Sequence, residues 1–174
     1  MNGASLRSRS PKEWHECVCT ERMIAPLSLL GLTSDRRRLI IAARYALGAV
    51  ALGTAAIGIG GYGLALLWPA TSLASVSGNY AVFGPDGFRK RPDGQMTVTT
   101  ILLFAPYILG AWINSRMWTR TEPAPVSLRQ GIMLGRIPSG REAARFSTII
   151  DLCAELPATS RQAGWCSFPM LDLV

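Results

Sequence analysis

The sequence predicts a membrane α-helical hairpin followed by an interfacial helix and a small, incomplete α/β lobe. Two observations lead to this fold class. No charged residue occurs over the 41 positions from Tyr45 to Pro85, although the 174-residue chain has a net charge of +7. After residue 120 the composition changes, and short apolar runs alternate with turn-forming residues.

The single histidine, His15, excludes several kinds of site. A Ser-His-acid hydrolase would depend on this one residue, and a multi-histidine metal centre cannot be built. We therefore expect no cofactor. The basic residues flank apolar runs, which does not predict a nucleic-acid partner. Residues 1–38 are predicted to form a flexible basic tail.

The uncharged run is too long for one membrane span and long enough for two. As a helix it would extend roughly 60 Å, whereas a hydrocarbon core of about 30 Å is crossed by about 20 residues. Gly60 and Gly61 lie inside the run, and paired glycines permit a tight reversal. We predict a two-helix transmembrane hairpin over residues 39–84, with spans at 42–60 and 62–83 and a kink at Pro69.

Basic residues flank both ends of this run. The positive-inside rule places such clusters in the cytoplasm, so both ends of the hairpin are expected there. Since the spans contain no ionisable acid or lysine, we expect an anchor rather than a transporter, with the lipid bilayer as its partner. The residues expected to orient the protein are Arg36, Arg37, Arg38, Arg44, Arg89, Lys90, Arg91, Arg116 and Arg120.

A second uncharged stretch covers Gln95 to Ser115. It is long enough to cross, but crossing would strand Arg116 and Arg120 on the far side, and Pro106 is expected to interrupt a helix. We therefore predict that residues 85–120 form a basic loop and an interfacial or re-entrant helix, with crossing as the alternative. The expected anchors at headgroup level are Tyr107, Trp112 and Trp118.

Residues 121–174 are predicted to begin an α/β lobe, after a proline-containing linker at 121–125. Ser139 and Glu142 have the spacing of a capping box, which predicts a short helix over Arg141–Phe146. This amount of structure buries little apolar surface, so the lobe is not expected to be stable alone. The predicted strands are Ile132–Gly135, Thr148–Leu152 and Trp165–Leu173.

Three segments of the lobe carry a resemblance to a known family: Gly131–Arg136, Ile149–Glu155 and Phe168–Asp172. In this order they resemble the opening of dual-specificity protein phosphatases of the tyrosine-phosphatase superfamily. Phe104–Arg120 is similar to the juxtamembrane segment of bacterial members that have a membrane hairpin. The resemblance implies a bacterial inner membrane, a phosphoprotein or phospholipid substrate for a full-length form, and Asp172 as a candidate general acid.

The nucleophile loop of that family, His-Cys-x5-Arg, is missing from this sequence. In such a loop a low-pKa thiolate attacks phosphorus while backbone N–H groups and the arginine hold the phosphate. The next arginine after Cys153 is Arg161, and none follows Cys166. We expect this chain to be inactive, either as the N-terminal part of such a phosphatase or as a small integral membrane scaffold or regulator.

Overall fold

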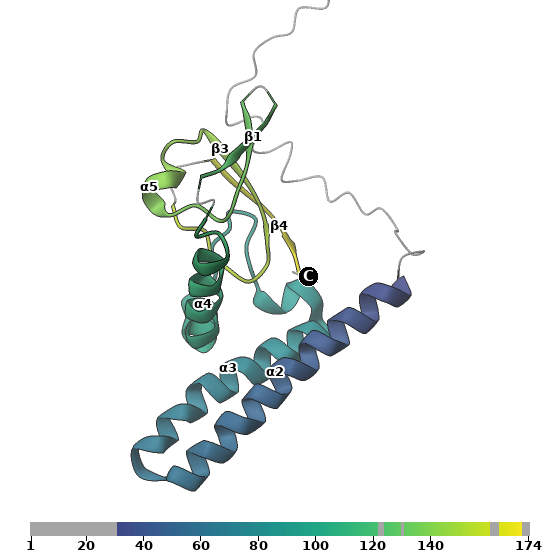
Figure 1. Cartoon of the computed structure of the whole chain (residues 1–174), viewed down its shortest axis with the longest axis vertical. Coiled ribbons are helices and arrows are strands. Elements are labelled where there is room, and N and C mark those ends of the chain that lie inside the picture. The colour runs from purple at the N-terminus through teal and green to yellow at the C-terminus, as the bar shows by residue number, and fades with distance from the viewer. Residues whose placement is uncertain (1–30, 122–123, 130, 161–163, 172–174) are drawn as a thin grey trace, which may run out of the picture.

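The computed structural model describes residues 31–121, 124–129, 131–160 and 164–171, and Figure 1 shows their arrangement. A long helical hairpin occupies one end of the molecule and a small α/β lobe the other, with the helix α4 between them (Figure 1). Of the predicted flexible tail, the structure describes only residues 31–38. Contrary to the prediction, these residues form the beginning of the first helix.

The two arms of the hairpin meet at Gly60 and Gly61, as the sequence predicts. The first arm is α2 (Gly31–Ile59), and the two glycines reverse the chain with φ angles of 63° and 49°. Glycine adopts such angles without strain. The second arm consists of the 3-10 helix η1 (Gly61–Leu66), α3 (Leu67–Gly78) and the π-helical turn η2 (Asn79–Phe83).

The second arm differs from the predicted kinked α-helix. Pro69 lies in the first turn of α3, directly after the 3-10 helix η1. Backbone N–H groups in the first turn of an α-helix have no partner within that helix, so a proline is tolerated there. Pro69 therefore lies where the chain changes from 3-10 to α geometry, and not at a kink inside a longer α-helix.

Small and short side chains bring the two arms together. The Ser77 hydroxyl donates to the Ala42 carbonyl of the opposite arm at 2.8 Å. A Cβ atom on Gly48 would lie 3.2 Å from a methyl group of Leu73. Around Gly53, which has the small-residue spacing typical of helix contacts, there is open space. The buried residues of α2, Ala42 and Ala56, lie on the same face as Gly53, so the arms pack along this face with space left beside Gly53.

The outer surface of the hairpin is apolar, and its charges gather at one end. The basic start of α2 lies beside the end of the second arm, since Arg38 Nη2 is 3.7 Å from the position of a Cβ on Gly84. No charged residue lies near the Gly60–Gly61 turn. The large apolar side chains exposed along the arms include Leu47, Val50, Ile57, Ile59, Tyr62 and Leu64.

The helix α4 (Val98–Trp118) is continuous, although Pro106 was expected to interrupt it. A proline leaves the carbonyl four residues earlier without its helical donor, which here is the carbonyl of Leu102. Trp68 Nε1 donates to that oxygen at 3.0 Å. The indole of α3 therefore replaces the missing backbone donor and joins the hairpin to α4.

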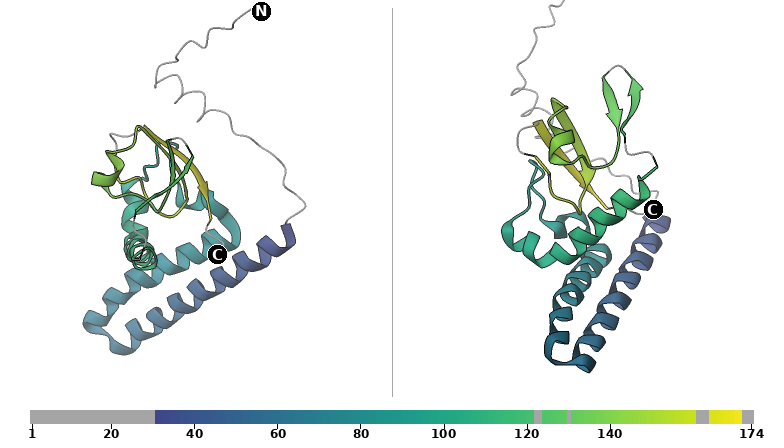
Figure 2. Two further views of the ribbon diagram at one scale, coloured as in Figure 1. Left: turned by 45° about the horizontal axis from the view of Figure 1, so that its top comes forward. Right: turned by 60° about the vertical axis from the view of Figure 1, so that its left-hand side comes forward.

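α4 crosses the second arm of the hairpin and does not run alongside it, and its Leu102 carbonyl is bonded to Trp68, seven residues after Gly61. In the left-hand view of Figure 2, α4 is seen end-on while both arms extend across the picture. Among the described residues, Asp35–Ile59 and Val98–Trp118 form helices long and apolar enough to cross a membrane, judged by length and composition.

The described part of the lobe contains two small sheets. β1 (Val126–Arg129) pairs antiparallel with β2 (Ile132–Leu134), and β3 (Thr148–Cys153) pairs parallel with β4 (Gly164–Met170). The three predicted strands are confirmed with small shifts at their ends, while β1 was not predicted. The capping box is also confirmed, but its helix, α5 (Gly140–Ala143), is shorter than expected.

The hydrogen bond from Trp68 to Leu102 makes a testable prediction. Trp68→Phe leaves the Leu102 carbonyl without a donor, which should cost about 1–3 kcal/mol of stability. Pro106→Ala restores a backbone N–H within reach of the same oxygen, so Trp68→Phe should cost less in that background. Unfolding of the four proteins in one detergent measures this coupling. If Trp68→Phe costs the same in both backgrounds, the Trp68 indole does not replace the backbone donor that Pro106 removes.

Candidate functional site

Lys90 lies inside the lobe, although the sequence analysis assigned it to the membrane-orienting charges. Its side chain is 0% exposed, and Nζ donates to Asp151 Oδ2 at 2.6 Å. Nζ also donates to the carbonyl oxygens of Cys153 and Leu156, each at 2.5 Å. Every N–H of the ammonium group thus has an acceptor, which is the condition for burying such a charge. Lys90 is therefore unavailable to lipid headgroups in this fold.

Asp151, the counterion of Lys90, accepts two further hydrogen bonds. Its Oδ1 accepts from the backbone N–H of Cys153 at 2.9 Å, and its Oδ2 accepts from Trp165 Nε1 at 3.0 Å. The residue is 6% exposed. One carboxylate thus links the Lys90 loop, β3 and β4.

The backbone after Lys90 continues the attachment to the lobe. Ser167 N donates to the Pro92 carbonyl at 2.9 Å, and Ala158 N donates to the Gly94 carbonyl at 2.8 Å. Gly94 has a φ of 74°, and a Cβ there would lie 2.4 Å from ring atoms of Trp165. Only glycine fits both requirements. The loop 90–95, which joins the hairpin to α4, is therefore packed into the lobe.

A second buried carboxylate, Glu155, lies where the lobe meets the hairpin. It is 8% exposed and accepts a hydrogen bond from the Tyr80 hydroxyl. The Tyr80 and Tyr45 rings are 5.8 Å apart, and the Tyr45 and Tyr107 rings are 5.5 Å apart. Tyr107 was expected at the headgroup level, but it is buried in this aromatic cluster because its face of α4 packs on the hairpin.

The cysteines of the described lobe do not have the character of a phosphatase nucleophile. Burial raises the pKa of the Cys153 thiol above its ordinary value. A nucleophilic cysteine needs the opposite shift. Cys166 is buried within β4. Asp172, the candidate general acid, lies outside the described residues, and within the described ranges no group of acidic, histidine or cysteine residues is placed to hold a metal.

Two arginines share one carboxylate beside the C-terminal end of α4. Arg116 Nη1 lies 3.6 Å from Glu142 Oε2, and Arg136 Nη2 lies 3.4 Å from Glu142 Oε1. Arg116 also donates to the Ile137 carbonyl at 3.1 Å and lies 5.1 Å from the centre of the Trp112 ring. Hydrogen bonds from Ser139, above all from its backbone N–H, lower the pKa of Glu142 to about 2, with help from Arg136.

The other predicted membrane-facing residues are mostly on the surface. Besides Lys90 and Tyr107, Arg116 is also largely covered, because its side chain is only 18% exposed and contacts the lobe. Arg38 is partly buried and lies 3.9 Å from Asp35. The exposed members of the predicted set are Arg36, Arg37, Arg44, Arg89, Arg91, Arg120, Trp112 and Trp118.

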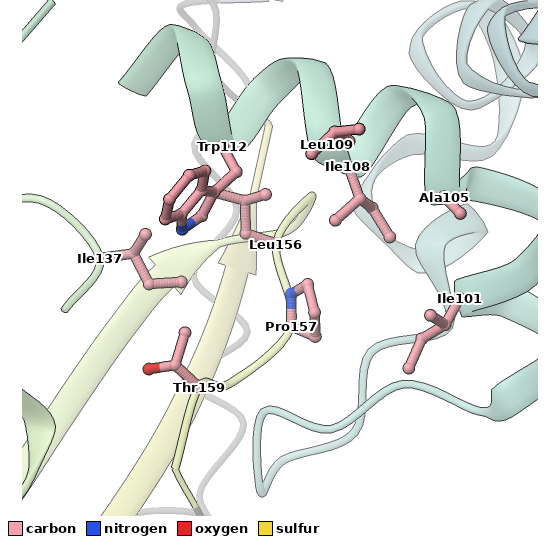
Figure 3. Close-up of a pocket in the computed structure, with 9 residues that line it drawn as sticks. All are labelled: Ile101, Ala105, Ile108, Leu109, Trp112, Ile137, Leu156, Pro157 and Thr159. Atoms are coloured by element: carbon pink, nitrogen blue, oxygen red, sulfur yellow. The ribbon is translucent and has the colours of Figure 1, made fainter. Parts of the chain in front are cut away.

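An apolar groove of about 280 Å³ runs between α4 and the loops of the lobe (Figure 3). Figure 3 shows side chains of α4 along one wall and of the lobe along the other. Arg116 follows Trp112 by one helical turn, so it extends the α4 wall. The lining residues are Ile101, Ala105, Ile108, Leu109 and Trp112 from α4, and Ile137, Leu156, Pro157 and Thr159 from the lobe.

Sequence reasoning missed both the partner of Lys90 and the groove. Nothing local distinguishes Lys90 from the neighbouring arginines, since its counterion Asp151 is 61 residues away. The α4 wall of the groove is visible in the sequence as apolar residues at helical spacing, but its opposite wall comes from loops. Comparisons with protein families, curated proteins and solved structures found no match.

The buried ion pair predicts a large difference between neighbouring basic residues. Lys90→Met leaves the Asp151 carboxylate buried without its cation and should cost about 3–5 kcal/mol. Arg89→Met is the matched control, since that exposed side chain should contribute less than about 0.5 kcal/mol. Denaturant unfolding of the two variants measures the difference, and similar small costs would show that the ion pair is unimportant.

The environment of Cys153 predicts slow alkylation. Because burial raises its pKa, the thiol should react with iodoacetamide at pH 7 at least about tenfold more slowly in the folded protein than in urea. Site-resolved mass spectrometry separates Cys153 from the other cysteines. Faster labelling in the folded state, with an apparent pKa below 7, would identify an activated thiolate and contradict the structural role.

Proposed function

We propose that this protein is an integral membrane protein whose helical hairpin anchors a phosphatase-like α/β lobe at the cytoplasmic membrane surface, without phosphoester hydrolysis by this chain. The supporting observation is the hairpin itself, because its outer surface is apolar and its basic residues gather at one end. Such a distribution is what a bilayer requires of an anchor with a cytoplasmic base.

The length and the exposed surface of the hairpin both favour insertion. α2 contains 29 residues and so extends roughly 43 Å, more than a hydrocarbon core of about 30 Å. Leu47, Val50 and Ile57 are 72%, 62% and 75% exposed in the isolated chain. A continuous apolar surface of this kind is costly in water and is typical of contact with lipid or with another protein.

In this proposal α4 lies in the membrane interface. It crosses the second arm at a steep angle, so a hairpin that crosses the bilayer leaves α4 roughly parallel to the membrane surface (Figure 2). Its exposed apolar face would contact lipid, and Trp118, which is 80% exposed, would lie at the headgroups. This exposed face of α4 consists of Val98, Leu102, Leu109, Ile113 and Met117.

In this proposal the lobe is held in place and is not catalytic. The loop 90–95 and α4 both contact it, which supports a constant position above the membrane. Cys153, the last residue of β3, has a raised pKa, and the Lys90 ammonium beside it is bonded to Asp151 and to carbonyl oxygens. In this proposal the resemblance to dual-specificity phosphatases applies to the strands and helix of the lobe and not to a catalytic site.

A scaffold or regulatory role is the second candidate, and the β3–β4 sheet favours it. Parallel strands are usually covered on both faces. Here Ile150 and Leu152 on β3, and Met170 on β4, are 64%, 50% and 55% exposed. These exposed apolar side chains are suited to contact with a further protein segment, either of a longer phosphatase-like protein or of a binding partner.

Two lysine substitutions test whether the hairpin is in lipid. Val50 and Leu128 are almost equally exposed, at 62% and 61%, but only Val50 lies in the proposed span. Val50→Lys should oppose insertion by about 2.5–3.5 kcal/mol, whereas Leu128→Lys should have little effect. Membrane fractionation and protease protection measure insertion. If both variants behave alike, the hairpin is not a membrane anchor.

Reporter fusions test the orientation. Fusions at Asp35 and Arg120 should be active with green fluorescent protein, which folds in the cytoplasm, and a fusion at Gly61 with alkaline phosphatase, which needs export. An exported Arg120 fusion would mean that α4 crosses the membrane, and it would contradict both the interfacial helix and the cytoplasmic lobe.

A further inference from the structure

We propose that the groove between α4 and the lobe binds one acyl chain of an anionic membrane phospholipid, whose phosphate is held beside Arg116 and Arg136. The inference rests on the proposed membrane location and adds a specific lipid site to it. Three properties of the groove support it, namely its lining, its opening and the charge at its end.

The lining of the groove fits a hydrocarbon chain. The only hydroxyl among the lining residues, that of Thr159, already donates to the Pro138 carbonyl at 2.6 Å. A peptide would bring backbone N–H and C=O groups that need partners, and these apolar walls offer few. From Ile101 to Trp112 the α4 wall extends roughly 16 Å, which is close to the length of about 15 Å that one acyl chain spans in a leaflet.

The groove opens toward the side of α4 that would contact the bilayer. Leu109 lines the groove and is also 59% exposed as part of the apolar face of α4. A lipid in the surrounding leaflet therefore reaches the groove past Leu109 without passing through water. This continuity favours a membrane lipid over a water-soluble apolar ligand.

The charge at the Trp112 end of the groove is complementary to a phosphate group. Arg116 and Arg136 share the single carboxylate of Glu142, so this cluster carries a net charge of about +1. The Nε atoms of both arginines have no acceptor among the described residues. Guanidinium groups bind phosphate with good geometry, and Arg120, one turn further along α4, is exposed and adds positive charge.

The experiment measures lipid retained by the full chain. Protein reconstituted in nanodiscs of phosphatidylcholine with a minor share of phosphatidylglycerol is transferred to detergent, and native mass spectrometry counts bound phosphatidylglycerol. Ala105→Phe fills the groove and should reduce retention several-fold. Ala51→Phe, on the exposed surface of α2, is the matched control and should leave retention unchanged.

A second pair of variants separates charge from folding. Arg136→Gln and Glu142→Gln both remove the same ion pair, and glutamine at position 142 still supports the capping box. Since they change the cluster charge in opposite directions, Arg136→Gln should lower and Glu142→Gln should raise phosphatidylglycerol retention, each by about fivefold. A purely structural effect would move retention in the same direction in both.

The outcomes distinguish the lipid site from the anchor. If the protein enters nanodiscs but Ala105→Phe retains as much phosphatidylglycerol as Ala51→Phe, the groove is not a lipid site and the membrane proposal stands. If Arg136→Gln and Glu142→Gln change phosphatidylglycerol retention in the same direction, the proposed phosphate contact is wrong. If the wild-type chain does not enter nanodiscs at all, both the anchor and the lipid site are wrong.

Discussion

Lys90 belongs to the connection between the hairpin and α4, yet its ammonium group lies within a lobe formed by residues much later in the chain. Moving such a group out of water costs several kcal/mol unless a counterion and further acceptors replace its hydration. Asp151 and the carbonyl groups of Cys153 and Leu156 meet this requirement. The lobe cannot form with its native contacts unless the loop 90–95 enters it, so the segment that follows the hairpin and the lobe depend on each other.

The Trp68–Leu102 hydrogen bond has a comparable effect on the other side of the molecule. Pro106 would weaken α4 if the Leu102 carbonyl had no donor, but an indole from the hairpin supplies one. The carbonyl that the proline leaves without a helical donor therefore becomes a contact between α3 and α4. With α4 held by the hairpin below and by the Arg116–Glu142 pair above, a groove remains between α4 and the lobe.

The correct sequence predictions rest on local signals, and the wrong ones on interactions between distant segments. Gly60–Gly61, the Ser139–Glu142 capping box and the short, mainly apolar run of β3 each act within a few residues. β1 was missed although its sequence, Val-Ser-Leu-Arg, alternates between apolar and polar residues, because it has only four residues and all of them are exposed. The environments of Lys90, Pro106 and Tyr107 depend on Asp151, Trp68 and Tyr45. These partners are 61, 38 and 62 residues away, so no local pattern contains them.

Because of the loop 90–95, the lobe is attached to the rest of the protein by noncovalent contacts as well as by the peptide linker that precedes it. The lobe is attached through Lys90, Pro92 and Gly94 as well as through the peptide chain that runs from α4 to β1. A single cut in that linker would therefore leave a noncovalent complex of two fragments and would not release the lobe. During synthesis Lys90 leaves the ribosome 61 residues before Asp151. Its ammonium group therefore stays hydrated until its counterion is made.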